Sequence, residues 1–365
     1  MNKIAIQYED TKALLYGSLI LGCGGGGGLS SGQFAIDKAF EMGQPTMVKL
    51  DSLEGQDDAV IITTSAVGAP AATEQFVTAD DYNRVVELID EKIDGNVYAF
   101  LTNELGAGST FNAFIQSATT GKPMLDAACN GRAHPLGTQG SMGLSETPEY
   151  RTIQTAVGGN PATHKYIELT TEGTVASTSR LVREAADQAG GLVVVARNPV
   201  DLAFVRGNAA IGALTMAKEL GDAYLSGKDV TEQLTNVVDL LEGKIEVAGP
   251  IEELELITVG GLDKGSFVIQ AGQNTYKMHI CNEYMALDMN GERLVTFPDL
   301  LMTFDSQTGV PVTSAELTQG QEITILSAPK ENLLLGAGMF DESGYEAIEQ
   351  LIDIELVKYN QDIIR

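Results

Sequence analysis

The fold is decided by the pattern of residues 97–125, which read VYAFLTNELGAGSTFNAFIQSATTGKPML. The apolar run 97–101 is short enough to be a buried strand. Behind a helix cap at Ser109, four apolar side chains follow at helical spacing, namely Phe111, Phe114, Ile115 and Ala118. Residues 123–125 are strand-like again. A strand, a helix and a second strand in succession predict a βαβ unit, in which a helix packed on the sheet joins two parallel strands.

The same alternation continues over residues 1–243. Residues 60–64 and 192–196 have the apolar, β-branched character of buried strands. Between them, one helical face is formed by Tyr82, Val85, Val86, Ile89 and Ile93. Residues 199–220 predict one long helix, because a proline stands near its start, where helices favour it. We therefore predict an α/β fold for residues 1–243, with a mainly parallel sheet covered by helices.

From about residue 245 the periodicity changes to two. Apolar and polar side chains alternate in 245–247, 254–256 and 276–281, with turn residues between the runs. Asn290-Gly291 between two strand patterns is a hairpin signal. The pattern predicts a smaller β domain, barrel-like or a sandwich, over residues 244–332. Helical spacing then returns, and we expect residues 333–365 to pack back on the first domain.

The charge balance restricts the partners of the protein. The 365 residues include 50 acidic and 23 basic side chains, which gives a net charge of −27. Such a field repels phosphate backbones and anionic lipid surfaces, so we expect neither nucleic acid nor a membrane as a partner. An anionic substrate would have to be bound by a local Arg or Lys against this field.

The cysteine content and the hydropathy favour a cytoplasmic protein. Three cysteines in a chain this long argue against a disulfide framework. The sequence shows no secretory signal and no apolar segment approaching the ~20 residues that cross a bilayer. A homo-oligomer is the expectation from general frequencies.

A run of glycines follows the first helical pattern. Residues 24–28 are all glycine, and Gly22 precedes them. Because glycine loses the most backbone entropy on folding, such a run indicates a sharp turn or a close approach, and its N–H groups can converge on a ligand. The candidate ligand-contacting residues are Gly24, Gly25, Gly26 and Gly27.

Two other interpretations of this loop stay open. The loop can simply pack a helix end against the sheet. Alternatively, Gly22, Gly24 and Gly27 fit the dinucleotide fingerprint G-x-G-x-x-G, with Asp51 at the distance of a ribose-binding acid. That fingerprint should follow a strand, whereas residues 9–21 have a helical pattern, so the match is weak. No Lys-Ser or Lys-Thr follows the glycines, which excludes a Walker A loop.

The densest group of polar side chains lies in residues 103–135. Asn103 and Glu104 stand at the carboxyl end of one predicted strand, and Asp126 stands at the end of the next. Ligands of open α/β sheets bind outside these strand ends. The segment continues with three further candidates, Cys129, Arg132 and His134. We therefore predict a polar crevice between this segment and the glycine run.

Each of these side chains has a chemical and a structural interpretation. Cys129 is a candidate nucleophile with His134 as its base, and Arg132 would bind a carboxylate bidentately. Glu104 and Asp126 are candidate acid–base groups. The structural alternatives are a buried thiol, a turn cap at the histidine and an ion pair between the arginine and the aspartate.

A second candidate site lies in the β region. His279, Cys281 and Glu283 alternate along one predicted strand and would project from the same face. An imidazole, a thiol and a carboxylate form a zinc-like ligand set, so a divalent metal such as zinc is a candidate cofactor. A solvated strand face is the commoner explanation of such a pattern.

Several ordered motifs resemble one known family. They are LGCGGGG at 21–27, GAP at 68–70, NELG at 103–106, GKP at 121–123, Asp126, GRA at 131–133, Asn282-Glu283, PDL at 298–300, and Thr308-Gly309 with Pro311. Together they span nearly the whole chain and resemble the S-methyl thiohydantoin desulfurase-like family, whose genes often neighbour hydantoinase/oxoprolinase genes. Where this chain has Cys23, the family motif often has Thr, so Cys23 is not expected to be an essential nucleophile.

The resemblance implies a fold and an activity. The implied fold is a three-layer α/β domain with a mainly parallel or mixed sheet, followed by a β domain. The implied activity is the hydrolytic removal of sulfur from a small thiohydantoin-like ring, with Asn103 and Asn282 among the substrate contacts. A metal-bound water would be a second route for this chemistry. A non-catalytic companion subunit of a hydantoinase/oxoprolinase is the alternative function.

Overall fold

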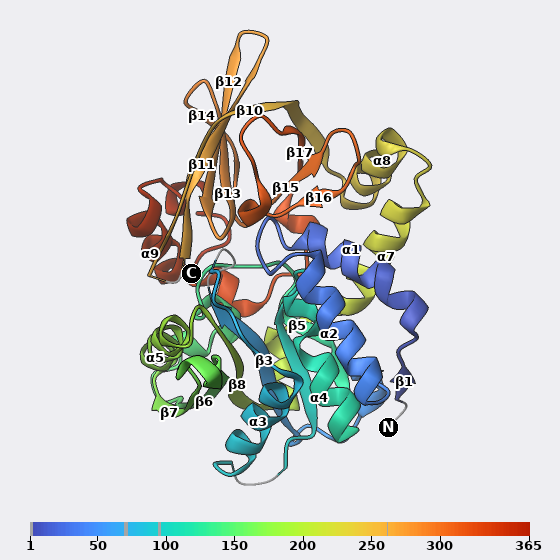
Figure 1. The fold of residues 1–365 in the computed structure, drawn as a ribbon, viewed down its shortest axis with the longest axis vertical. Helices are drawn as coiled ribbons and strands as arrows, with labels where there is room; N and C mark the ends of the chain where they lie inside the picture. The colour runs from blue at the N-terminus through green and yellow to red at the C-terminus, as the bar shows by residue number, and fades with distance from the viewer. Residues whose placement is uncertain (1–2, 69–71, 94–95, 261) are drawn as a thin grey trace.

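The computed structural model describes residues 3–68, 72–93, 96–260 and 262–365. Residues 69 and 70 of the GAP motif lie outside this description. The described chain forms two sheets in two domains, an α/β domain at the bottom of Figure 1 and a β domain above it. The predicted α/β class with a second β domain is therefore confirmed.

The first sheet is mixed. Its nine strands within the described residues are β1 (Ile4–Ala5), β2 (Thr46–Val48), β3 (Val60–Gly68), β4 (Ala99–Glu104), β5 (Met124–Asn130), β6 (Thr152–Gly158), β7 (Ile167–Gly173), β8 (Leu192–Asp201) and β9 (Ala210–Ile211). The order is β1-β2-β5-β4-β3-β8-β6-β7, and β9 pairs with β5. Strands β2, β5, β4 and β3 run parallel, whereas β8, β6 and β7 are antiparallel additions. The βαβ unit predicted from residues 97–125 is β4-α4-β5.

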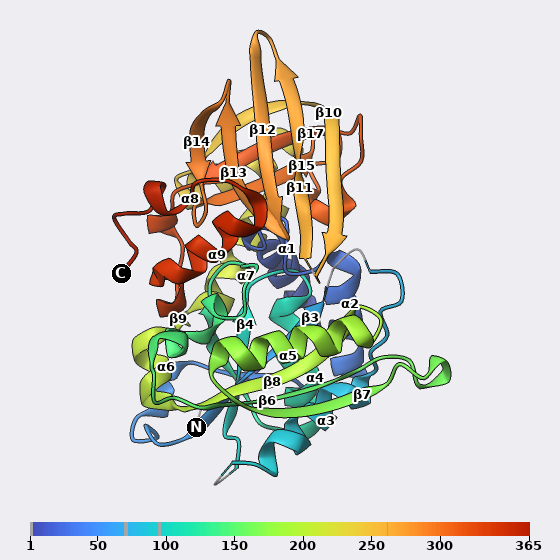
Figure 2. The same ribbon diagram turned by 90° about the vertical axis from the view of Figure 1, so that its left-hand side faces the viewer.

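Helices cover both faces of this sheet. They are α1 (Thr11–Leu21), α2 (Leu29–Met42), α3 (Ala79–Asp90), α4 (Asn112–Thr120), α5 (Val175–Gln188), α6 (Leu202–Asn208) and α7 (Ala213–Ser226). Two further helices of the described chain, α8 (Val230–Leu241) and α9 (Glu342–Ile352), contact strands of the second sheet. The largest apolar core lies under α1 to α4 and α7, and two smaller cores lie under α6 and α5 on the other face. Figure 2 shows α5 in front, running alongside β6, β7 and β8. The arrangement is three-layered, as the resemblance implied.

The long helix predicted over residues 199–220 is wrong. Strand β8 continues to Asp201, whose side chain accepts the Phe204 N–H at 2.7 Å and so begins the short helix α6. The two-residue strand β9 and Gly212, at φ +82°, separate α6 from α7. The apolar residues that suggested one long helix belong to two helices. The helix cap at Asp201 and the turn at Gly212 separate them, and neither can be seen in the apolar periodicity.

Helices α1 and α7 pack unusually closely, and this contact fixes the start of the glycine run. A Cβ atom on Gly17 would lie 1.7 Å from the Ala217 carbonyl oxygen, and one on Gly221 would lie 1.7 Å from the Ala13 oxygen. Only glycine permits that approach. Helix α1 is thereby held rigidly, with its carboxyl end pointing to the second domain (Figure 1).

The second sheet is antiparallel and open. Its eight strands in the described chain are β10 (Lys244–Val259), β11 (Leu262–Ala271), β12 (Asn274–Cys281), β13 (Glu283–Met289), β14 (Glu292–Thr296), β15 (Leu300–Asp305), β16 (Pro311–Val312) and β17 (Glu322–Ala328), in the order β14-β13-β12-β11-β10-β17-β15-β16. No closed barrel is found among the described residues, so the barrel-like part of the expectation is wrong. The hairpin predicted at Asn290-Gly291 is confirmed, since both residues have positive φ and join β13 to β14.

The last segment of the chain contacts both domains. The Gly131 N–H donates to the Leu334 carbonyl at 2.8 Å, and the Gly336 N–H donates to Asn130 Oδ1 at 3.3 Å. Helix α9, in contrast, packs its apolar face on β12 and β13 of the second domain. The start of residues 333–365 thus returns to the first domain, and the helix also touches it, since its cap residue Asp341 accepts a hydrogen bond from the Ser145 hydroxyl at 3.2 Å.

Candidate functional site

The glycine run links α1 to α2 and lies against the loop that follows β4. The backbone N–H groups of Gly108 and Ser109 donate to the Gly26 carbonyl oxygen at 2.8 and 2.9 Å. The Ala133 N–H reaches the Leu21 carbonyl at 3.3 Å. The structure therefore brings the glycine run and the 103–135 segment together.

The same run is hydrogen bonded to the second domain. The Tyr284 N–H donates to the Cys23 carbonyl, and the Ser314 N–H donates to the Gly24 carbonyl, both at 2.8 Å. Gly24 has φ +90°, and a Cβ atom there would lie 2.6 Å from the Tyr284 ring. The loop is thus a joint between the two domains, and its glycines are required by the closeness of the β sheet.

Gly25 and Gly27 meet different neighbours. A Cβ atom on Gly25 would lie 2.0 Å from Glu283 Oε1, so the loop backbone rests directly on that carboxyl group. A Cβ atom on Gly27, at φ +83°, would lie 2.8 Å from Ser31 Oγ at the start of α2. Gly25 therefore lies beside the carboxyl groups described below, whereas Gly27 lies against the first turn of helix α2.

The dinucleotide fingerprint lacks its structural context. The glycines follow helix α1 and not a strand. Asp51 lies in a 3₁₀ turn (Leu50–Leu53), beyond the end of β2 at Val48. Neither position has the strand–loop–helix arrangement that such a site requires.

Glu104 ends β4 and lies beside His134. The His134 backbone N–H donates to Glu104 Oε2 at 3.1 Å, and the ring Nε2 is 3.4 Å from the same oxygen. Burial raises the pKa of Glu104 to about 7, against the lowering effects of that N–H group and of the Arg197 and Arg132 charges. A carboxyl group that titrates near neutrality can both take and give a proton at working pH.

His134 is a neutral partner in this cluster. Burial lowers its pKa to about 3, and the nearby Arg197 charge acts in the same direction. Its ring contact with Glu104 is therefore one between a neutral ring and a carboxyl group, not an ion pair. Asn103 Nδ2 lies 3.5 Å from the same Nε2. Gly140 leaves space for both side chains, since a Cβ atom there would lie 2.4 Å from Asn103 Oδ1.

Glu283 brings a second carboxyl group from the other domain. It begins β13 and is 2% exposed. Burial raises the pKa of Glu283 well above its usual value, and the charge of Glu104 is the next cause, while Arg132 and Arg183 oppose the shift. Two carboxyl groups in such a setting titrate unequally, because the ionised form of one disfavours the ionised form of the other.

Arg132 lies at the domain junction, but its donors are engaged. It is fully buried, stacks on the Phe297 ring at 4.5 Å, and donates to the carbonyls of Ala133, Pro298 and Asp299 at 2.6–3.1 Å. These bonds hold the two domains together. A bidentate grip on a carboxylate, as the sequence suggested, is not formed by these atoms, and only Nη2 is without a partner among the described residues.

Orphan polar atoms gather around these residues. Of the seventeen buried side-chain atoms without a hydrogen-bond partner among the described residues, seven belong to this region: Asn103 Oδ1, Ser109 Oγ, Arg132 Nη2, His134 Nδ1, Gln139 Nε2, Arg197 Nε and Glu283 Oε2. Buried polar atoms are normally paired, so such a cluster is typical of a site that binds a polar ligand. We call this set, with Glu104 and Gly25, the junction cluster.

Asp126 is not part of the junction cluster. It lies in the middle of β5 and not at its end. Its two carboxylate oxygens accept hydrogen bonds from the Thr215 N–H and hydroxyl at 3.0 and 2.6 Å. Because Thr215 is in the first turn of α7, Asp126 anchors that helix. The sequence predicted Asp126 at the end of a strand, but β5 extends four residues further, to Asn130.

Cys129 projects to the other face of β5. It lies in the core that includes Leu125 and Ala127, with its sulfur 3.2 Å from Thr63 Oγ1. Burial raises the pKa of the Cys129 thiol to about 12. A reactive cysteine needs a lowered pKa and access, so this position does not favour the predicted nucleophile.

The three residues of the candidate metal site do not share one strand. Asn282, at φ +57°, ends β12 and begins a tight turn, so Glu283 belongs to the next strand. His279 pairs with Asp288 at 2.9 Å, whereas Cys281 is buried against α9. The described part of the chain contains no group of three His, Cys, Asp or Glu side chains that could hold a metal ion. The predicted zinc-like set is therefore not assembled.

Asn282 itself is a turn residue. Its Oδ1 accepts the Asp263 N–H at 2.9 Å, and its carbonyl accepts a hydrogen bond from the Ser314 hydroxyl. These bonds shape the turn that presents Glu283. A direct substrate contact by this side chain stays a prediction.

Sequence reasoning missed three members of the junction. Arg197 comes from β8, Gln139 from the loop after β5, and Arg183 from α5, where its Nη2 donates to the Pro135 carbonyl at 3.2 Å. A charged residue directly after the apolar run 192–196 was a signal for Arg197. No comparable signal marks the other two.

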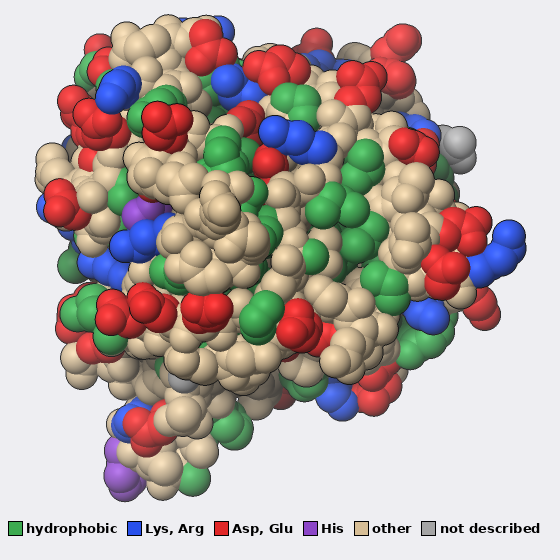
Figure 3. Space-filling model, turned by 90° about the horizontal axis from the view of Figure 1, so that it is seen from above, with side chains coloured by type: hydrophobic (Ala, Val, Ile, Leu, Met, Phe, Trp, Pro, Cys, Tyr) green, Lys and Arg blue, Asp and Glu red, His purple; other side chains and the backbone are tan. Residues whose placement is uncertain are grey.

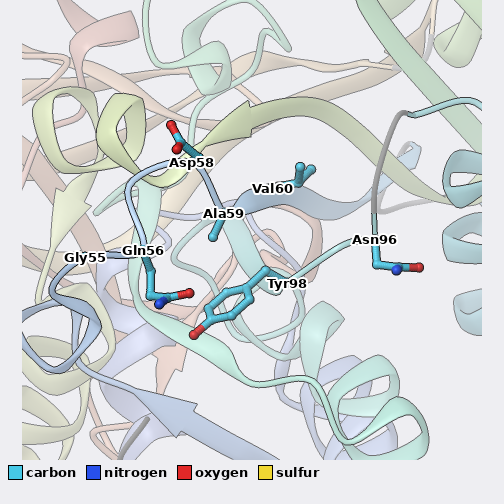
Figure 4. Close-up of a pocket in the computed structure, with 7 residues that line it drawn as sticks. All are labelled: Gly55, Gln56, Asp58, Ala59, Val60, Asn96 and Tyr98. Atoms are coloured by element: carbon cyan, nitrogen blue, oxygen red, sulfur yellow. The ribbon is translucent and has the colours of Figure 1, made fainter.

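Two open hollows lie at the opposite ends of the strands, away from the junction cluster. One, of about 420 Å³, is lined by residues at the amino ends of β3 and β4, among them Gln56, Asp58 and Tyr98 (Figure 4). The other, of about 350 Å³, adjoins it and is lined by Lys92 and Arg151, among others. The side chains in Figure 4 do not converge on one another, and we call this first hollow the amino-edge pocket.

Comparisons with known proteins agree with this architecture. A solved crystal structure of a protein from Chromobacterium violaceum is similar over 96% of this chain and 97% of that one, with 18% sequence identity and a TM-score of 0.71. That likeness concerns the fold alone. A search of curated proteins finds no match. None of the described helices is both long and apolar enough to span a membrane.

Two family profiles match the chain itself. Residues 9–163 match the N-terminal domain of S-Me-THD-like proteins, and residues 174–341 match their C-terminal domain. The boundary between the profiles falls near β7, within the first sheet, so both profiles contribute strands to that sheet. Since the two matches cover most of the sequence, the chain belongs to the S-Me-THD-like family, the S-methyl thiohydantoin desulfurase-like family that its motifs resemble.

Proposed function

We propose that this protein is a hydrolase-type enzyme that removes a sulfur substituent from a small thiohydantoin-like ring at the junction cluster. The observation that supports this proposal is the pair of buried carboxyl groups, Glu104 and Glu283, whose pKa values are both raised and which influence one another. Membership of the family supplies the class of substrate. Neither the thiol of Cys129 nor a metal ion is needed for the route described next.

The reaction on an S-methyl thiohydantoin requires proton transfers in both directions. Water attacks the ring carbon that carries the sulfur, forming a C–O bond while the C=N electrons move to nitrogen. Glu104, as the carboxylate, takes the proton of the water, and protonated Glu283 gives a proton to the ring nitrogen. The products of this step are a tetrahedral intermediate, a protonated Glu104 and an ionised Glu283.

Collapse of the intermediate restores both groups. Glu283 takes the hydroxyl proton as the C=O bond forms, the C–S bond breaks, and Glu104 protonates the departing sulfur. The net change is one water consumed, one methanethiol released and one hydantoin formed. The His134 backbone N–H holds Glu104 in position, and the unpaired ring Nδ1 is available for a hydrogen bond with the substrate ring.

The test is to incubate the full-length protein with S-methyl thiohydantoins and to measure methanethiol and hydantoin together. Equal molar release of both is expected from the native chain and from Glu172→Gln, whose side chain is exposed on β7. The Glu104→Gln and Glu283→Gln variants should release neither at an appreciable rate. Absence of thiol release by the native protein would remove the assignment. If the protein instead co-purified with a hydantoinase/oxoprolinase and altered its turnover, a companion subunit would be the better description.

A further inference from the structure

Arg197 is a buried guanidinium group that the protein does not neutralise. It is 3% exposed, and no side-chain hydrogen bond or ion pair to it is formed within the described residues; its Nε is fully covered. A charged group in such a setting is costly unless an opposite charge or several hydrogen bonds compensate it. Gly137 has no side chain to crowd the guanidinium group, since a Cβ atom there would lie only 3.2 Å from Arg197 Nη1.

Two further arginines place positive charge in the same region. Arg132 acts electrostatically on both carboxyl groups, and Arg183 acts on Glu283. Arg197 acts on Glu104 and His134. Against these three cations stand Glu104 and Glu283, whose pKa values burial raises, a neutral imidazole, and Asp299, on which Arg132 acts. The junction thus contains three cations in a chain whose net charge is −27 and whose upper face carries many scattered acidic side chains (Figure 3).

Within the described residues Arg197 forms no ion pair, so its charge is open to a substrate anion. Acidic residues are abundant in this protein, and in the described part of the chain the one whose charge acts on Arg197 is Glu104, which forms no ion pair with it. A substrate anion would be attracted here even though the field of the whole molecule repels it. Planar guanidinium groups pair with carboxylates in a directional way that also selects geometry.

We infer that the junction cluster accepts a ring substrate that carries a carboxylate side arm, and that Arg197, with the free Nη2 of Arg132, binds that carboxylate. This inference rests on the proposed function for its ring chemistry. It adds the substrate class, namely thiohydantoins formed from acidic amino acids and not those with neutral or apolar side arms. Arg197 is a specificity-determining residue in this account.

A different role for Arg197 makes a different prediction. If it served only to keep Glu104 ionised, its removal would shift the pH dependence of turnover and lower the rate with every substrate alike. If it binds the substrate carboxylate, its removal changes the preference between charged and uncharged substrates. The ratio of two kcat/KM values therefore separates the two roles.

The experiment compares the S-methyl thiohydantoins derived from glutamate and from glutamine, which have nearly the same shape and differ in charge. We expect the native protein to prefer the glutamate compound by roughly 30- to 100-fold in kcat/KM, the range of a charge-assisted hydrogen-bond pair. In Arg197→Met this ratio should fall to near one, and Arg197→Lys should restore part of it. The matched control is Arg180→Met, an exposed arginine of α5, which should keep the native ratio.

The outcomes separate this inference from the proposed function. Equal turnover of the two compounds by the native protein would overturn the inference and leave the desulfurase activity standing. If neither compound released thiol, the proposed function would fail, and the inference would then be decided by binding of the hydantoins that carry a propionate or a propionamide arm. A rise in Tm with the propionate compound alone, lost in Arg197→Met, would support it. Equal shifts, or none, would overturn it.

Discussion

The two ends of the strands in the nine-stranded sheet differ, because one has an open hollow and the other has a cluster of buried polar groups. At the amino ends of β3 and β4 there is an open hollow of about 420 Å³ whose side chains do not converge. At the carboxyl ends, the glycine run and the second domain close over two carboxyl groups, a histidine and three arginines. Volume alone would direct attention to the first edge, whereas shifted pKa values and orphan polar atoms direct it to the second.

The largest expected effect is on turnover. Glu104→Gln removes the group that takes the proton from water, so kcat for thiol release should fall by about 10²–10⁴-fold, the usual contribution of a positioned acid–base residue. The matched change at the amino-edge pocket, Tyr98→Phe, should leave kcat unchanged. A steady-state thiol assay on both variants measures the contrast. A loss of kcat in Tyr98→Phe with none in Glu104→Gln would indicate that the reaction takes place at the amino-edge pocket.

The same substitution should alter the pH dependence of stability. Below pH 4.5 the Glu104 carboxyl is protonated in the folded and unfolded chains. Between pH 4.5 and 7 the folded protein still holds a proton that the unfolded chain has lost, so native stability falls as the pH rises. Gln has no proton to lose, so the Glu104→Gln variant should gain up to about 3 kcal/mol over the native protein between pH 4.5 and pH 8.

Urea unfolding of the two proteins at pH 4.5, 6 and 8 checks this prediction. His134 titrates in both proteins. Its lowered pKa adds a separate loss of stability as the pH falls from 6.5 towards 3. A stability difference that stayed constant with pH would show that Glu104 titrates normally and would contradict its assigned environment.

Replacement of Gly25 tests the closure of the junction. The Cβ atom in Gly25→Ala would lie 2.0 Å from Glu283 Oε1, so the loop or the carboxyl group must shift. We expect a stability loss of about 1–3 kcal/mol, as for other overpacked sites, together with a lower kcat. Gly207→Ala is the control, because a Cβ atom there meets nothing within 4 Å. Thermal unfolding of both variants should show a lower Tm only for the first.

The smallest effect is expected at Cys129. Because its thiol is buried and its pKa is raised to about 12, Cys129→Ala should retain the native kcat and lose only about 1 kcal/mol of stability from the missing sulfur contacts. Thiol-release assays with and without a cysteine-modifying reagent measure this. Loss of activity in this variant would support Cys129 as the nucleophile.

The sequence predicted the parts of the site that depend on local pattern. Glu104 was placed correctly because β4 ends where its apolar run ends. The glycine run was predicted to approach something closely, and Gly25 does approach Glu283. The α/β class followed from periodicity, whereas the antiparallel placement of β8 next to β3 did not, because pairing across the sheet leaves no trace in spacing.

The remaining parts depend on tertiary contacts. Glu283 was assigned to a metal site because Asn282 was taken as a strand residue, although asparagine is one of the few residues that readily adopt positive φ. Asp126 was misplaced because the end of β5 is set by its pairing with β4 and not by its apolar residues. Arg183 comes from α5, far along the sequence, and only the packing of α5 beside the junction reveals it.

The most direct test of the central claim is a crystal structure of the protein with a hydantoin that carries a propionate arm. The account predicts the ring between Glu104 and Glu283 beside Gly25, with the carboxylate on Arg197. A ligand bound instead in the amino-edge pocket, against Gln56 and Tyr98, would contradict it.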